Sequence, residues 1–275
     1  MRILVLGASG NVGSEVVAAG LEAGLQVRAV ARHLPADAGG AEWVIGDLND
    51  AASLYDALSD VDLVFTLAGY GGLADTLRRA KETGVRRVVL LSSSSAPTGR
   101  TGNAVAKYHI ESEGLVRESG LPWTFLQPNT FMTNTLEWAP QLAEGDTVTD
   151  AFGAVAISTV DPRDVGAVAI RTATDEAHAG RAHRLSGPEA LRPADRLAIL
   201  GAVLGRDLRF VPKSDEQAHA DMIAAMPPEY VEAFFEFFAD GLIDETTVQP
   251  AVEEILGRPA APFRDWAERH RQAFS

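Results

Sequence analysis

The chain has 275 residues, of which 46% are hydrophobic and 23% are charged, and its formal net charge is −14. This composition indicates a globular protein of one large domain or two small ones, and it excludes wholesale disorder. The acidic balance argues against nucleic acid or an anionic membrane as a partner, and the absence of cysteine excludes disulfides. No stretch resembles a signal peptide or reaches the roughly 18 apolar residues of a membrane helix, so we expect a soluble cytoplasmic protein.

Short apolar runs alternate with amphipathic stretches through the first half of the chain. We predict strands at Ile3–Leu6, Val27–Val30, Trp43–Ile45, Leu63–Thr66, Val88–Leu91 and Thr124–Leu126. We predict helices between them at Val12–Ala23, Ala51–Leu58, Leu73–Thr83 and Ala104–Ser119. Apolar strands linked by helices are typical of a parallel sheet that is covered on both faces. The expected fold is therefore α/β, with a Rossmann-like, doubly wound parallel sheet.

The pattern changes after about Pro128. A loop with a short strand is expected over Gln141–Ala156, and a strand that returns to the sheet over Arg181–Leu185. Further helices are predicted at Pro162–Ala173, Pro193–Leu204, Pro228–Asp240 and Pro262–Phe274. We therefore expect a Rossmann lobe over residues 1–130, which the strand near 181–185 rejoins, and a smaller, mainly helical substrate lobe over residues 131–275.

A glycine-rich turn follows the first predicted strand. Gly7, Gly10 and Gly13 have the spacing G-x-x-G-x-x-G at the start of a predicted helix. Gly7 permits a sharp turn, Gly10 lets the backbone approach a pyrophosphate, and Gly13 allows the helix to pack closely on the strand. The helix N-terminus offers free N–H groups and a positive dipole end. The turn predicts a dinucleotide site and not a P-loop, because no Gly-Lys-Ser/Thr follows it.

Two charged residues at later strand ends indicate which dinucleotide is bound. Arg32 ends the second strand about 20 residues after the loop, where NAD-specific sites usually have Asp or Glu. An arginine at this place can pair with a 2′-phosphate, which favours NADPH (NADP) as the cofactor. Asp47 follows the third strand and can reach the adenine amino group. The alternative for both residues is an ordinary surface charge.

Together with the glycine turn, motifs along nearly the whole chain resemble the NmrA-like family of atypical short-chain dehydrogenases/reductases. They are Ser92-Ser93, His109–Glu113, Leu121–Asn129, Phe131–Asn134, Asp161–Gly166, Ser186–Leu191 and Gly257-Arg258-Pro259. The resemblance implies an NAD(P)-binding lobe, a small C-terminal lobe and a substrate cleft between them. It also implies one of several activities, since members resemble quinone, azo-dye or triphenylmethane reductases, enzymes of aromatic natural products, or NADP(H)-sensing regulators.

The expected cofactor contacts come from the turn, the strand ends and the resemblance. They are Gly7, Ser9, Gly10, Asn11, Val12, Arg32, Asp47, Leu48, Leu67, Ala68, Gly69, Ser92 and Asn129. The substrate is expected to contact Tyr70, Ser94, Tyr108, Phe131, Trp138 and Phe234. The aromatic residues from Tyr230 to Phe238 have the spacing of one helix face, which either packs in the core or covers an aromatic substrate.

Ordinary short-chain reductases use a Tyr-x-x-x-Lys pair as the acid. Aligning the helix on Glu113, as in extended members of the superfamily, places Val105 at the tyrosine position and His109 at the lysine position, so the usual acid is absent. We predict that His109 contacts the nicotinamide ribose or the substrate oxygen, as the resemblance suggests, and that Ser93 orients a carbonyl. The alternatives are a structural histidine and a serine-rich turn. No metal is expected, because His109 and Glu113 have no third ligand in view.

These features predict an NADPH-dependent reductase of an apolar, quinone-like or polycyclic aromatic small molecule. Hydride transfer to such an acceptor needs less help from an acid, because the charge delocalises in the product. Two alternatives remain open: an NADP(H)-sensing regulator that binds a protein partner without catalysis, and an enzyme of a non-redox step. The sequence leaves the oligomeric state open, with a homodimer among the alternatives.

Overall fold

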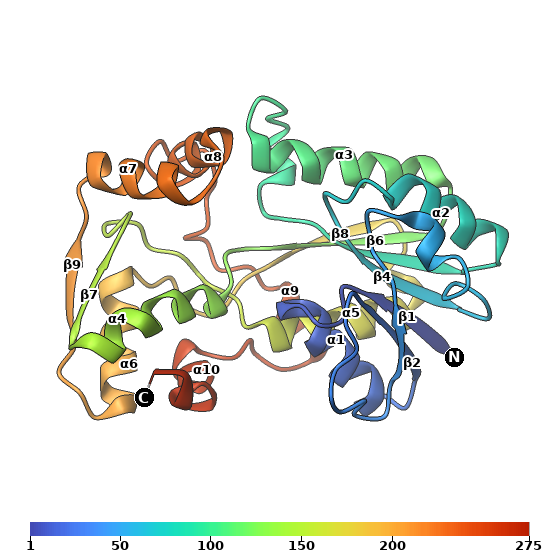
Figure 1. The fold of residues 1–275 in the computed structure, drawn as a ribbon, viewed down its shortest axis with the longest axis horizontal. Helices are drawn as coiled ribbons and strands as arrows, with labels where there is room; N and C mark the ends of the chain where they lie inside the picture. Colours follow the sequence, from blue (N-terminus) through green and yellow to red (C-terminus); the bar gives the residue numbers. More distant parts are fainter. Residues whose placement is uncertain (275) are drawn as a thin grey trace.

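The computed structural model describes residues 1–274, and its central feature is a parallel sheet of seven strands (Figure 1). The strands are β1 (Arg2–Leu6), β2 (Gln26–Ala31), β3 (Glu42–Ile45), β4 (Leu63–Leu67), β5 (Arg87–Leu91), β6 (Trp123–Pro128) and β8 (Arg181–Leu185). Their order is β3-β2-β1-β4-β5-β6-β8, and every neighbouring pair is parallel. The predicted Rossmann-like α/β fold is confirmed, and the predicted returning strand pairs with β6 at the edge of the sheet.

Helices cover both faces of this sheet. They are α1 (Asn11–Glu22), α2 (Leu73–Glu82), α3 (Ala104–Ser119), α5 (Pro162–Thr174) and α9 (Ala251–Leu256). Ile3 and Val5 pack with α1, α5 and α9, whereas Leu4 and Leu6 pack with α2 and α3 on the other face. Figure 1 shows α2 and α3 above the sheet, and α1 and α5 below strands β4, β6 and β8. Burial of both faces explains why the strands are continuous apolar runs.

A second core lies beyond the carboxyl ends of the strands, at the left of Figure 1. This lobe contains η3 (Met132–Trp138), α4 (Ala139–Glu144), β7 (Thr147–Asp150), α6 (Pro193–Leu204), β9 (Arg209–Pro212), α7 (Asp215–Ala225), α8 (Pro228–Phe238), α10 (Phe263–Arg269) and η5 (Arg271–Phe274). Strands β7 and β9 form a separate parallel pair, and the fully buried Phe263 and Trp266 fill the core. Within residues 1–274, no helix has both the length and the apolar character needed to cross a bilayer.

Two expectations differ from the structure. The helix predicted at Ala51–Leu58 is a single 3-10 turn, η1 (Ala51–Leu54), and the chain then passes through turns to β4. The stretch expected as loop and strand begins with α4 before β7. The expected division after residue 130 stays a prediction; besides the expected returning strand β8, helices α5 and α9 also come after residue 130 and pack with the sheet. The chain therefore crosses between the lobes more than once.

Candidate functional site

The glycine turn between β1 and α1 borders a cavity of about 240 Å³. Seven of the predicted cofactor residues line it: Gly7, Ser9, Gly10, Arg32, Asp47, Leu48 and Leu67. They come from the ends of β1, β2, β3 and β4, which meet at one edge of the sheet. Ligands of open parallel sheets bind at this edge, where the strand order reverses. The structure thus gathers the predicted nucleotide residues around one cavity.

The backbone of the turn fits a pyrophosphate. Gly7 has a φ of +71°, and a Cβ at Gly13 would overlap the carbonyl oxygen of Gly7, so both positions need glycine. Gly10 caps α1 without a side-chain hydrogen bond, and the first turn of α1 has no acidic residue. Asn103 and Asp161, in contrast, cap α3 and α5 with their side chains. The first N–H groups of α1 are therefore left for an anionic group.

Arg32 and Asp47 line this cavity from the ends of β2 and β3. Arg32 is exposed and makes no hydrogen bond or ion pair with other residues of the described range 1–274. An unpaired guanidinium is suited to a 2′-phosphate. The carboxylate of Asp47 accepts the backbone N–H of Asn49 at 2.9 Å, which holds the side chain in a turn. The positions of both residues are compatible with the predicted preference for NADPH.

A second cavity of about 410 Å³ continues from the first, because Leu67 and Tyr70 line both. The predicted residues that line the second cavity are Leu67, Ala68, Tyr70, Ser92, Ser93, Ser94, Tyr108, His109, Asn129, Phe131 and Phe234. The nucleotide cavity and this reaction cavity therefore form one cleft along the carboxyl ends of the strands. That arrangement places the expected cofactor and substrate residues side by side.

Helix α3 presents Val105, Tyr108 and His109 to the reaction cavity. Lys107 is exposed, forms an ion pair with Glu111 at 3.8 Å and does not line the cavity. Burial lowers the pKa of His109 to about 4, and its Nδ1 finds no hydrogen-bond partner among residues 1–274. Burial raises the pKa of Tyr108, whose ring centroid lies 4.2 Å from that of His109. At neutral pH, His109 is an uncharged ring that can donate one hydrogen bond.

The serines after β5 face two buried glutamates. Ser92 Oγ donates to Glu113 Oε1 at 2.6 Å, and Ser94 Oγ donates to Glu245 Oε1 at 2.6 Å. Ser93 Oγ accepts the backbone N–H two residues further along the chain, at 3.1 Å. Each of the three hydroxyls is held in place by a hydrogen bond. In the described part of the chain, no three His, Asp or Glu side chains gather as a metal site.

The aromatic face of α8 lines the reaction cavity. Tyr230, Phe234, Phe237 and Phe238 all line it, and Phe237 is 4% exposed. The rings of Phe234 and Phe238 are nearly parallel, with planes 4° apart and centroids 6.4 Å apart. The same face therefore packs in the core and forms an apolar wall of the cleft, so the two interpretations from the sequence are compatible.

Trp138 does not lie in the cleft, which corrects the expectation for this residue. It is 2% exposed in the core of the second lobe, and its Nε1 donates to Asp150 Oδ2 at 2.8 Å. The 3-10 turn η3 directs the side chain toward β7 instead of the sheet. Sequence analysis also missed Thr130, Asn134 and Glu245, which line the reaction cavity. Asn134 belongs to the motif Phe131–Asn134, whereas no motif or periodic pattern in the sequence singles out Thr130 and Glu245.

Four predicted cofactor residues have other contacts in the structure. Asn11 Nδ2 donates to Thr133 Oγ1 at 2.7 Å, which joins the start of α1 to the second lobe. The side chain of Val12, in the first turn of α1, is buried, and the backbone N–H of Gly69 donates to Ser112 Oγ of α3 at 3.0 Å. The Asn129 amide donates to Ser158 and accepts from a guanidinium of β8. Asn129 therefore borders the cavity while its amide is used to connect strand ends.

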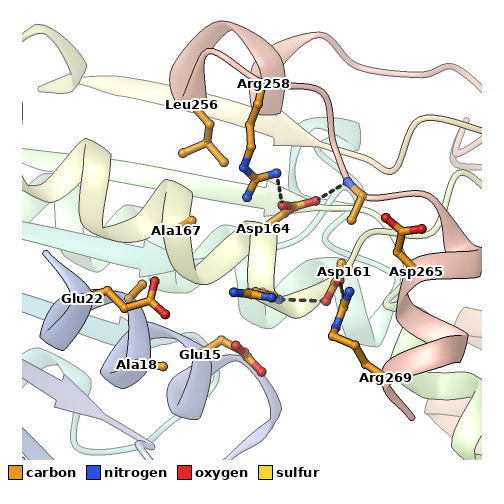
Figure 2. A pocket seen from close by; sticks show the side chains of 13 residues that line it. Glu15, Ala18, Glu22, Asp161, Asp164, Ala167, Leu256, Arg258, Asp265 and Arg269 are labelled. Carbon is orange, nitrogen blue, oxygen red and sulfur yellow. Dashed lines mark hydrogen bonds and ion pairs between the residues drawn. The ribbon is translucent and has the colours of Figure 1, made fainter. Parts of the chain in front are cut away.

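A third cavity, of about 510 Å³, lies on the α1–α5 face and is lined by charged side chains (Figure 2). Asp161 caps α5 and is paired with Arg269. Asp164 is paired with Arg258 at 2.8 Å and accepts the backbone N–H of Ala261 at 2.7 Å. These buried carboxylates are satisfied by partners from the C-terminal segment. We interpret the cluster as a structural connection between α5 and that segment.

Known proteins resemble this chain over nearly its full length. Residues 7–176 match the family described as NAD(P)H-binding. The chain is 40% identical to the (4-alkanoyl-5-oxo-2,5-dihydrofuran-3-yl)methyl phosphate reductase of Streptomyces griseus subsp. griseus, and the 280-residue alignment covers 99% of each chain. It is 34% identical to the NAD(P)H azoreductase of Xenophilus azovorans over 284 aligned residues, again 99% of each. Its fold is similar to that of Citrobacter sp. triphenylmethane reductase complexed with NADP(H), with a TM-score of 0.80 and 20% identity over 98% of this chain and 99% of that one.

Proposed function

Because the chain belongs to the NAD(P)H-binding family and its full-length relatives are named reductases, we propose that it is an NADPH-dependent reductase of an apolar, quinone-like or polycyclic aromatic small molecule. NAD(P)H-dependent reduction follows from the family and these relatives. NADPH as the preferred form rests on Arg32, and the class of acceptor rests on the reaction cavity.

The proposed class of acceptor rests on the residues that line the reaction cavity. Rings of Tyr70, Tyr108, Phe131 and the α8 aromatics line it, and no lysine or arginine does so within residues 1–274. His109 is uncharged at neutral pH because burial lowers its pKa to about 4. A phosphate on the acceptor, such as the one named for the Streptomyces relative, would favour a cation at the site. A flat and uncharged acceptor fits this cavity better.

The residues along the cleft divide into binding and reaction roles. Ser9, Gly10 and the start of α1 bind the pyrophosphate, and Arg32 pairs with the 2′-phosphate. Leu67, Ala68 and Ser92 border the nicotinamide end. Bound NADPH supplies the hydride.

His109 and Ser93 are the proposed catalytic residues. His109 donates a hydrogen bond to the nicotinamide ribose or to the acceptor oxygen, and Ser93 orients the acceptor. Val105 stands where an ordinary reductase has its tyrosine, so the chain relies on orientation and on exclusion of water. A quinone-like or dye-like acceptor suits this arrangement, because its product delocalises charge.

Transient kinetics with purified protein test the proposal. The protein is titrated with NADPH and then mixed with a panel of simple quinones, azo dyes and enones, and with a phosphorylated enone as the matched charged acceptor. We expect NADPH oxidation with the uncharged aromatic acceptors and slower oxidation with the phosphate. Oxidation by the phosphorylated compound alone would overturn the acceptor class. Tight NADPH binding without any oxidation would favour the NADP(H)-sensing alternative.

A further inference from the structure

Glu245 is a buried carboxyl group at the wall of the reaction cavity, and the proposed function gives it no role. It is 5% exposed and belongs to the segment between α8 and α9. Its Oε1 is 2.6 Å from Ser94 Oγ, and its Oε2 is 2.7 Å from Thr130 Oγ1 and 3.1 Å from the Thr130 backbone nitrogen. A carboxylate in such a place costs free energy unless it is hydrogen-bonded, paired with a cation or protonated.

The backbone around Glu245 is anchored to the strand ends. Its carbonyl oxygen accepts the backbone N–H of Ser158 at 2.7 Å and the Ser158 hydroxyl at 2.8 Å. Arg184 of β8 donates to the carbonyl oxygen of Asp244 at 3.0 Å. The neighbouring segment thus holds the Glu245 carboxyl against the serine that follows β5. These backbone contacts fix the position of Glu245.

The charged and titratable groups around Glu245 are few. Arg184 lies on β8, and Asp244 precedes Glu245. His109 and Tyr108 line the cavity from α3, Tyr70 from the loop after β4 and Tyr230 from α8. Burial raises the pKa of Glu245, although its hydrogen bonds and Arg184 lower it. Burial moves the pKa of His109 the other way, to about 4. These opposite shifts within one cavity keep the histidine neutral, without an imidazolium proton to transfer, and favour a proton on the glutamate.

We propose that Glu245 stores the proton of the reduction and delivers it through Ser94. When Glu245 carries the proton, Oε1–H donates to Ser94 Oγ, and the serine O–H is free to donate into the cavity. When Glu245 is ionised, the serine O–H is turned back toward the carboxylate. The state of the glutamate therefore decides whether Ser94 is a donor or an acceptor toward the substrate.

The proton balance is simple and rests on the proposed reductase function. Hydride addition leaves one negative charge on the acceptor. The Ser94 O–H bond breaks as the acceptor takes that proton, and a new Ser94 O–H bond forms as the Glu245 Oε1–H bond breaks. The charge ends on the Glu245 carboxylate, which takes a proton from water after the product leaves. No further co-reactant is needed.

Glu113 supplies a matched control. It accepts the hydroxyl of Ser92 at the same distance, 2.6 Å, and is also buried. Unlike Glu245, it does not line the reaction cavity, and it is paired with Arg117 at 2.9 Å. Two buried Ser–Glu contacts after one strand therefore differ in access to the substrate. Only the contact with Glu245 is expected to affect the proton step.

The test measures single-turnover NADPH oxidation by a simple quinone from pH 5 to 9 in four proteins: the unsubstituted chain, Glu245→Gln, Ser94→Ala and Glu113→Gln. We expect the rate of the unsubstituted chain to fall as the pH rises and to show a solvent isotope effect. Glu245→Gln and Ser94→Ala should each lose this pH dependence and react about tenfold more slowly at low pH. Glu113→Gln should keep it. An unchanged pH dependence in Glu245→Gln would overturn the relay.

Infrared difference spectra of the unsubstituted chain against Glu245→Gln separate this proposal from the proposed function. A carboxylic acid band that titrates and disappears in Glu245→Gln shows that Glu245 holds a proton, whether or not any acceptor is reduced. A carboxylate band at every pH would refute the proton store by itself. Absence of turnover with every acceptor, in contrast, would refute the reductase assignment.

Discussion

Substitution of Arg32 by alanine should separate NADPH from NADH binding. Arg32 is exposed and unpaired within residues 1–274, so it gives up no protein contact when it binds a phosphate. A hydrogen-bonded contact with a charged group contributes about 1.5–3 kcal/mol. Water and salt screen an exposed pair, which favours the lower end of that range. Since 1.4 kcal/mol corresponds to a factor of ten, Arg32→Ala should weaken NADPH binding about 10- to 100-fold.

Calorimetric titration with both nucleotides at low and moderate ionic strength measures this effect. NADH binding should change less than about threefold, and the difference should shrink as salt rises. Arg86→Ala is the matched control, because Arg86 is also an exposed arginine but pairs with Asp62 at 3.0 Å, before β5 and away from the carboxyl ends of the strands. Equal losses of affinity for NADPH and NADH in Arg32→Ala would refute the assigned role.

Three further predictions concern the glycine turn, the apolar wall and the buried histidine. Gly13→Ala should lower stability by about 1–3 kcal/mol and weaken NADPH binding, because its Cβ meets the carbonyl of Gly7; calorimetry that finds an unchanged Tm would contradict this. Phe234→Ala removes apolar surface from the wall of the reaction cavity, so it should raise the KM for a quinone about tenfold without changing the Kd for NADPH. An equal change in KM and Kd would contradict a contact of this ring with the acceptor alone. Because folding lowers the pKa of His109 from 6.5 to about 4, its contribution to stability is present above pH 6.5 and is lost as the pH falls toward 4. Urea unfolding should show a loss of about 2 kcal/mol between pH 7 and 5 that is absent in His109→Gln, and the same loss in both proteins would contradict the assignment.

Features that depend on neighbouring residues were predictable from the sequence. The spacing of Gly7 and Gly13 indicates a local backbone requirement. The structure explains it by the positive φ of Gly7 and by the close approach of Gly13 to the carbonyl oxygen of Gly7. The apolar runs of the strands report burial on both faces of the sheet. The helix predicted at Ala51–Leu58 failed because a short amphipathic pattern there is satisfied by one turn and a loop. Helices α7 and α9 were missed, and they are 11 and 6 residues long.

By itself, the sequence determined the α/β class, the parallel sheet and the nucleotide turn, because each follows from patterns within a few residues. Only the tertiary structure decided what faces the substrate. Glu245 meets Ser94 across 151 residues of chain, and no periodicity marks its irregular segment. Trp138 resembles a cleft residue in sequence, yet its contact with Asp150 buries it in the second core. Such contacts depend on how two lobes pack, and that packing is a property of the whole chain.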